Sequence, residues 1–216
     1  MDERTAEVRR VLERYLTEVV ENFDLCPWAK PARLGAEVAI EVLWGIPTVD
    51  AWSDAARDLL ARPETRVAMV VAPQIEATPA ELRVIRNRVA SRITTAGIAD
   101  FHPDAIVDTG SPARLVPALR RSPDPLLQLV PLALLESVRG APPAASIVQQ
   151  AQILSGQAPP PRGDVADRIA AGNHARVMAR RAELEATLAS IAEDRRTSYP
   201  RAGITVGTGR TRSAAS

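Results

Sequence analysis

The sequence has few of the residues that most often carry protein chemistry. Its 216 residues include one cysteine and two histidines, and aromatic side chains make up only 3%. A single cysteine cannot form an internal disulfide, which favours a reducing compartment. So few Cys and His side chains also argue against a structural zinc site. Because aromatics are scarce, the core must be built from aliphatic side chains.

Other absences exclude further classes of protein. There is no apolar run long enough to span a bilayer, no P-loop and no G-x-G-x-x-G motif. The 27 basic and 26 acidic residues leave a net charge of +1, which provides no long-range attraction to nucleic acid or to an anionic membrane. Residues 1–4 are acidic and do not have the form of a secretory signal. We therefore expect a cytoplasmic protein that binds neither nucleic acid nor membranes. The sequence indicates no oligomeric state and no particular cofactor.

What the sequence does contain is 46% hydrophobic residues, arranged with clear periodicity. Spacing of 3.6 residues predicts helices, and alternation or short apolar runs predict strands, at these ranges: helices at 4–24, 50–61 and 78–96, strands at 36–43, 66–72 and 98–107. The third helix is predicted to open with a capping box at Thr78-Pro79-Ala80-Glu81 and to end at Gly97. The apolar run 126–135 contains Pro131, which disfavours a helix interior and a central strand, so we predict a kinked or two-part helix there. This order predicts an α/β fold: a small layered sheet of three to four strands, at least partly parallel, with helices packed on it.

Beyond residue 140 the composition changes. Proline-rich spacers at 141–143 and 158–161 flank a short predicted helix, and a charged helix follows at about 164–194. From residue 198 the chain is rich in Gly, Thr, Arg, Ser and Ala without periodicity, which predicts disorder. The sequence therefore predicts an α/β core domain at 1–140, linkers and C-terminal helices at 141–197, and a disordered tail at 198–216.

The only cysteine and the only lysine, Cys26 and Lys30, share one short loop after the first predicted helix. A nearby cation lowers the pKa of a thiol and populates the thiolate, so Cys26 is a candidate nucleophile or redox thiol. A Cys-Pro step beside an aromatic also resembles short haem-responsive motifs. The alternative is a small hydrophobic side chain buried at a helix-to-loop corner. Trp28 and Lys30 are candidates for substrate binding in the same loop.

His102 follows a predicted strand, at the kind of position where α/β folds gather functional residues. It is a candidate general base toward Cys26, or a second ligand to haem or a metal. The alternative is a histidine hydrogen-bonded to the backbone at the turn made by Pro103.

Arg121 and Ser122 precede Pro123, a pattern typical of a helix start. A serine N-cap with proline at the first helical position presents free backbone N–H groups, and an arginine beside them makes an anion site. The alternative is an ordinary capped helix with a solvated arginine. Ser111-Pro112 has the same form and also predicts a short helix, so the pattern alone is weakly specific.

Three segments, in this order, resemble the family catalogued as domain of unknown function 1415. The first is Asp24-Leu25-Cys26-Pro27-Trp28-Ala29-Lys30-Pro31, where members show Asn-Leu-Cys-Pro-Phe-Ala-Lys-Pro. The second is Asp100-Phe101-His102-Pro103, where members show Ser-Phe-His-Pro. The third is Arg121-Ser122-Pro123-Asp124-Pro125, where members show Arg-Ser-Pro-Tyr-Pro. The resemblance covers about residues 5–140.

The resemblance implies a fold and a set of shared residues, but no reaction. The chain also departs from the family pattern: the family histidine after the third segment is Gln128 here, and an Arg-Glu pair is replaced by apolar residues around Pro131 and Leu132. The C-terminal extension has no counterpart in the family. The chain therefore resembles a divergent member.

These patterns together predict a small cytoplasmic enzyme acting on a small anionic substrate at a cysteine- and histidine-centred site. Cys26 would be the nucleophile or redox thiol and His102 the base, and the predicted substrate-binding residues are Lys30, Trp28, Arg121 and Ser122. The first alternative is a haem- or metal-binding oxidoreductase with Cys26 and His102 as ligands. The second is a non-catalytic interaction module whose C-terminal helices bind a partner.

Overall fold

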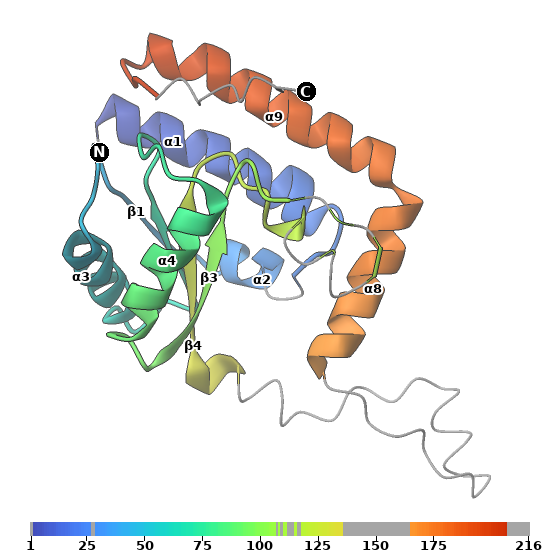
Figure 1. Cartoon of the computed structure of the whole chain (residues 1–216), viewed down its shortest axis with the longest axis horizontal. Helices are drawn as coiled ribbons and strands as arrows, with labels where there is room; N and C mark the ends of the chain where they lie inside the picture. Colours follow the sequence, from blue (N-terminus) through green and yellow to red (C-terminus); the bar gives the residue numbers. More distant parts are fainter. Residues whose placement is uncertain are drawn as a thin grey trace, which may run out of the picture.

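The computed structural model describes residues 2–26, 29–106, 108, 110–111, 115, 118–135 and 165–206, with the backbone alone for 165–171. Trp28, most of the short helix predicted after Ser111, the proline-rich spacers and residues 207–216 lie outside the described residues. The four described strands are β1 (Val38–Val42), β2 (Val67–Val71), β3 (Ala96–Phe101) and β4 (Leu126–Pro131). They form one mixed sheet in the order β1-β2-β4-β3, with β1 and β2 parallel and β4 antiparallel to both neighbours. The predicted α/β fold is confirmed (Figure 1).

Helices cover both faces of the sheet. On one face pack α3 (Val49–Leu60) and α4 (Pro79–Ala90). On the other lie α1 (Glu3–Arg14), its π-helical continuation η1 (Tyr15–Glu21), α2 (Ala29–Leu34) and the long C-terminal α9 (Arg181–Arg201), which runs alongside α1 (Figure 1). The remaining described helices are the 3-10 turn η2 (Ala118–Arg120) and α8 (Val165–Ala179). Among the residues that the structure describes, no helix combines the length and apolar character needed to cross a bilayer.

Alternation along the strands builds two separate cores. In β2, Val67, Met69 and Val71 face α1 and η1, whereas Ala68 and Val70 face α3 and α4. All five residues of β2 are buried, which agrees with the continuous apolar run in the sequence. The core against α1 and η1 is the larger one, and it also receives side chains from α8 and α9.

The capping box predicted for α4 is present. The Thr78 hydroxyl accepts from the Glu81 backbone N–H, and the Glu81 carboxylate accepts from the Thr78 N–H at 2.7 Å. The predicted end of this helix at residue 96 is wrong, since α4 ends at Ala90 and β3 begins at Ala96. Gly97 therefore lies inside a strand. A Cβ at this position would come within 2.8 Å of Leu135 Cδ1, so a larger residue here would require the Leu135 side chain to move.

The helix predicted over residues 126–135 is also wrong in its first half, which forms the interior strand β4. Pro131 is tolerated because it is the last residue of β4 and faces only Ala96 of β3. Pairing with β2 ends earlier, at Leu129 opposite Ala68, so the missing N–H of Pro131 breaks no hydrogen bond on that side. Residues 132–135 are helical, so the helix prediction is confirmed only for the end of this run.

The C-terminal segment is more ordered than its composition predicts. The single charged helix expected at 164–194 is divided at Arg180 into α8 and α9, and α9 continues to Arg201. The disorder predicted from residue 198 is therefore wrong as far as residue 206, because Tyr199 and Ile204 are buried in the core shared with α1. Burial of these two apolar side chains is enough to order a segment whose composition is otherwise polar.

Charged side chains attach α9 to the rest of the protein. The Asp194 carboxylate accepts from Arg10 at 2.8 Å and from Arg14 at 2.5 Å, both on α1. Hydrogen bonds from Arg10 and then from Arg14 lower the pKa of Asp194 to about 2, against the opposing effect of burial. In the same C-terminal half of α9, Tyr199 and Arg195 contact the buried Asp124, whose carboxylate accepts from the Tyr199 hydroxyl and from Arg195 Nε, the latter at 2.7 Å.

The Asp194 pairs predict a pH-dependent contribution to stability. A carboxyl whose pKa is lower in the folded protein than its ordinary value of 3.8 stabilises the fold above that value, and the contribution is lost as the pH falls toward about 2. We expect Asp194→Asn to lower the free energy of unfolding by about 1 kcal/mol at neutral pH, after allowing for solvent screening, and to match the wild type near pH 2. Urea unfolding at both pH values measures this difference in the free energy of unfolding.

The control is Glu193→Gln, which removes only an exposed pair with Arg196 and should change the free energy of unfolding little. An equal deficit at both pH values would contradict the assignment.

The Tyr199–Asp124 contact gives a second prediction. Burial raises the pKa of Tyr199, and the Asp124 charge raises it further, so the phenol stays protonated and donates. We expect Tyr199→Phe to lower the free energy of unfolding by about 1–3 kcal/mol, because a buried carboxylate loses a donor. Tyr15→Phe is the matched control: the Tyr15 hydroxyl is also buried but has no hydrogen-bond partner among the described residues, so its removal should not lower the free energy of unfolding and should raise it if anything. Equal losses in the two variants would refute this interpretation.

Candidate functional site

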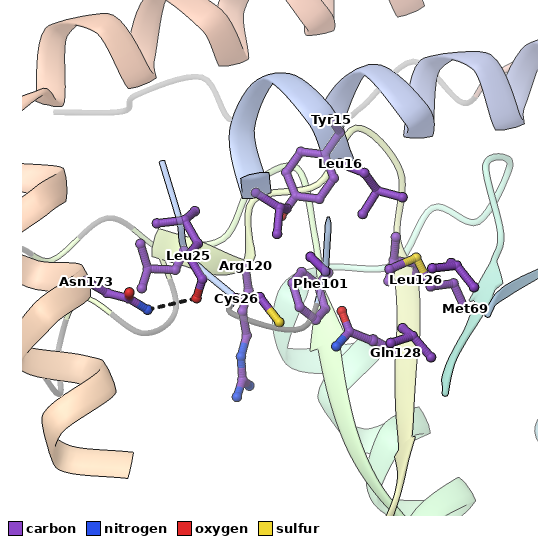
Figure 2. A pocket seen from close by; sticks show the side chains of 15 residues that line it. Tyr15, Leu16, Leu25, Cys26, Met69, Phe101, Arg120, Leu126, Gln128 and Asn173 are labelled. Carbon is purple, nitrogen blue, oxygen red and sulfur yellow. Dashed lines mark hydrogen bonds between the residues drawn. The ribbon is translucent and has the colours of Figure 1, made fainter. Parts of the chain in front are cut away.

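A cavity of about 330 Å³ lies between the η1 layer and the sheet. It is near the lower limit of the roughly 300–1,000 Å³ typical of small-molecule sites. Its walls are mostly apolar, with a few polar groups among them, and the lining residues are Tyr15, Leu16, Val20, Leu25, Cys26, Ala29, Val38, Val67, Met69, Phe101, Leu119, Arg120, Leu126, Gln128 and Asn173. Helices η1, α2 and α8, the loop between η1 and α2, η2 and all four strands contribute to it. Figure 2 shows this arrangement.

Cys26 reaches the cavity because the chain turns sharply after η1. Asp24 adopts a left-handed backbone conformation with φ of 50°, which ends the helix, and the Leu25 N–H returns to the Val20 carbonyl at 2.9 Å. The Cys26 carbonyl then accepts from the N–H of Ala29, the first residue of α2. The Cys26 side chain is half-buried, and its sulfur points toward Phe101 and Gln128 (Figure 2).

Helix α8 holds this loop in place. Two side chains of α8 and one from Arg180, which follows it, donate to carbonyls just beyond the end of η1. Asn173 donates to Leu25 at 3.0 Å, Arg176 to Asp24 at 3.2 Å and Arg180 to Asn22 at 2.9 Å. The two arginines also place positive charge at a helix C-terminus, where it is favourable. The Asn173 contact is drawn in Figure 2. The C-terminal extension is therefore part of the site and not an appendage.

The Tyr15 hydroxyl is the most unusual group in the cavity wall. The residue is 2% exposed, and its hydroxyl forms no hydrogen bond with any described residue. Burial raises the pKa of Tyr15, and the nearby Cys26 raises it further, so the phenol remains protonated. A buried hydroxyl without a partner costs about 1–3 kcal/mol, and a ligand that carries an acceptor would supply the missing bond.

Gln128 and Arg120 are the other polar side chains that distinguish this cavity. Gln128 lies in β4 opposite Met69 and Ala99, and alternation places it on the same face as Leu126. In Figure 2 its amide points toward Cys26. Arg120 ends η2, and its guanidinium lies 3.8 Å from the Asp100 carboxylate. The site therefore combines a thiol, a phenol and an amide around an apolar space, with the Arg120 guanidinium at its edge beside Asp100.

His102 is not among the residues that line the cavity. It is buried, and both ring nitrogens are engaged with the backbone. The Asp104 N–H donates to Nδ1 at 3.0 Å, so Nδ1 is an acceptor and Nε2 carries the proton that it donates to the Ala77 carbonyl at 2.7 Å. These are the contacts expected of a histidine that fixes a turn. Its predicted role as base or ligand stays a prediction.

Of the other predicted binding residues, the three that the structure describes, Lys30, Arg121 and Ser122, are also outside the cavity wall. Arg121 pairs with Glu185 of α9 at 2.7 Å, and the buried Ser122 hydroxyl donates to the Asp124 carbonyl at 2.6 Å. The helix predicted to begin at Ser122-Pro123 is wrong, because the chain turns there and enters β4. The N–H groups on which the predicted anion site depended are therefore not those of a helix start. Lys30 is exposed on α2.

Within the described part of the chain, no group of three or more His, Cys, Asp or Glu side chains is arranged to hold a metal ion. Ligation of haem or a metal by Cys26 and His102 stays a prediction.

Four functional candidates were not predicted from the sequence: Tyr15, Arg120, Gln128 and Asn173. Two of them carried a signal. Tyr15 is a hydroxyl-bearing side chain on an otherwise aliphatic helix stripe, and Gln128 is a polar residue inside an apolar run. Nothing in the sequence separates Arg120 from Arg121, or marks Asn173 on a distant helix.

Comparison of the chain with protein-family models, with curated proteins and with solved structures finds no match. The resemblance to the domain of unknown function 1415 family therefore stays an expectation drawn from three short motifs, and the geometry of the Cys26 cavity is what remains for assigning a function.

Proposed function

We propose that this protein is a small cysteine-dependent enzyme that binds a small, largely apolar molecule in the Cys26 cavity. The observation that carries the proposal is that two residues line the same cavity: Cys26, which is half-buried, and Tyr15, whose buried hydroxyl lacks a hydrogen-bond partner among the described residues. A packed scaffold gains nothing from such a hydroxyl, whereas a ligand site uses it for orientation.

The cavity walls select the kind of ligand. Aliphatic side chains and one phenyl ring cover most of the surface, so the body of the ligand is apolar. The volume of about 330 Å³ suits a compact molecule rather than a large cofactor. Arg120 at the cavity wall favours a ligand that also carries negative charge, which is the substrate class that the sequence led us to expect.

The chemistry open to these groups is addition of the thiol to a carbonyl. The sulfur–carbon bond forms, the π electrons of the carbonyl move to its oxygen, and that oxygen ends with the proton that the thiol gives up. The Tyr15 hydroxyl, which burial keeps protonated, would donate a hydrogen bond to the oxygen as charge develops. The Gln128 amide, which points toward Cys26 in Figure 2, offers a second donor.

Alkylation of the single cysteine tests this proposal. We expect Cys26 to react with N-phenyl iodoacetamide faster than with iodoacetamide, relative to the same pair of rates for glutathione, because the cavity binds the phenyl group. Tyr15→Phe should slow the phenyl reagent by roughly threefold to tenfold, the worth of one neutral hydrogen bond, without lowering the free energy of unfolding. Rates are followed by mass spectrometry of the intact protein.

Tyr199→Phe is the control, since its hydroxyl contacts Asp124 and not the cavity. It should leave the alkylation rates unchanged. The proposal fails if the ratio of the two alkylation rates, N-phenyl iodoacetamide over iodoacetamide, is no higher for Cys26 than for glutathione. A Soret band in the purified protein that disappears in Cys26→Ser would instead establish haem ligation.

His102 gives a separate prediction. From its two backbone contacts we expect His102→Asn to lower the free energy of unfolding by about 1–3 kcal/mol and to leave the pH profile of Cys26 alkylation unchanged. If His102 acts as a base toward Cys26, as the sequence predicts, the midpoint of that profile shifts in the variant. The profile therefore distinguishes a catalytic histidine from one that fixes the turn.

A further inference from the structure

Three arginines converge on one carboxylate beside the cavity. Arg86 Nε lies 3.3 Å from Asp100 Oδ1, Arg120 Nη1 lies 3.8 Å from the same oxygen, and Arg83 Nε lies 3.9 Å from Oδ2. Arg83 and Arg86 are three residues apart on α4, so they share one face of that helix. Among the described residues, Asp100 is the only acidic ion-pair partner of each of the three arginines.

This cluster carries an excess of positive charge. Three guanidinium groups against one carboxylate leave a charge of about +2 at a partly exposed position. The Asp100 side chain is 10% exposed, whereas that of Arg83 is 56% exposed and that of Arg120 is 37% exposed, so solvent and solutes reach the arginines. Burial lowers the pKa of Arg120; the Asp100 charge opposes this, and Arg86 and Arg83 lower it further. The arginines therefore repel one another, and an added anion would relieve the repulsion.

Arg120 connects the cluster to the cavity. Phe101 faces the cavity, and by strand alternation the preceding Asp100 faces the opposite side of the sheet, where α4 packs. Because β3 is the edge strand, a side chain can reach past it from one side to the other. Arg120 does so: it contributes to the cavity lining, and its guanidinium lies beside Asp100. In Figure 2 this guanidinium points away from Tyr15 and the apolar wall.

We propose that Arg83, Arg86 and Arg120 bind the phosphate group of a phosphorylated small molecule whose apolar, carbonyl-bearing part occupies the Cys26 cavity. The arginine fork matches phosphate oxygens in a two-point contact, and a phosphate monoester carries about −1.5 to −2 charges near neutral pH, close to the excess on the cluster. The assignment of the organic part rests on the function proposed for the cavity, whereas the phosphate site rests on the arginines alone.

The first test uses inorganic phosphate and isothermal titration at constant ionic strength. We expect binding to the wild type that is weakened about tenfold or more in Arg86→Ala, and also in Arg83→Ala, whose exposed side chain is not needed for folding. Arg88→Ala is the matched control, because this exposed arginine lies on the same helix and its loss changes the net charge equally. Absence of phosphate binding, or equal weakening in Arg88→Ala, would overturn the phosphate site.

The second test asks whether one ligand occupies both the phosphate site and the Cys26 cavity. It measures how well small molecules protect Cys26 against iodoacetamide. Phenyl phosphate should protect at lower concentrations than benzoate, and benzoate at lower concentrations than benzyl alcohol, because the charge of the head group decreases in that order. Arg83→Ala and Arg86→Ala should remove the advantage of phenyl phosphate without changing protection by benzyl alcohol. If benzyl alcohol protects and phenyl phosphate does so no better, the joint ligand is refuted while the cavity function stands. If phosphate binds but none of the three compounds protects, the cavity function and the joint ligand fail together, and only the phosphate site survives.

Discussion

Alternation of side chains along β3 and β4 is the constraint on which the candidate site depends. It directs Phe101, Leu126 and Gln128 toward the cavity under η1, and it directs Asp100 and Leu127 toward the α3 and α4 side. A shift of one residue in either strand would exchange its two sets of side chains, and in β3 it would place the Asp100 carboxylate in the apolar cavity. The antiparallel pairing of β4 between β2 and β3 holds the register.

The C-terminal helices α8 and α9 hold the Cys26 loop and the first helix in place. The loop that carries Cys26 has carbonyls just beyond the end of η1, and α8 with the residue that follows it supplies donors to them, from Asn173 and two arginines. Helix α9 then attaches to α1 through Asp194 and to the start of β4 through Asp124. Each of these two carboxylates accepts from donors at defined positions, which fixes how α9 lies against α1 and against the start of β4. The cavity thus belongs to the whole chain rather than to its first 140 residues.

Much of the fold followed from local pattern. The amphipathic first helix, the alternating strand at β1, the fully apolar β2 and the capping box of α4 were all predicted from nearby residues alone, because each signal is contained within one element. The errors came where a distant contact decided the outcome. Glycine after a helical pattern predicts a helix end, but Gly97 is a strand position packed against Leu135. Proline predicts an interruption of the apolar run, but Pro131 is the last residue of β4.

By itself, the sequence determined the fold class and the presence of an unusual thiol at the end of the first helix. Periodicity and the rarity of cysteine are properties of the chain, and they need no knowledge of what packs where. Only the tertiary structure decided which polar groups accompany Cys26, because Tyr15, Arg120 and Gln128 come together through sheet order and helix packing. It likewise kept His102 out of the cavity wall by engaging both of its nitrogens with the backbone. Hydrogen bonds to the main chain depend on where the chain passes in space, and no spacing along the sequence records that.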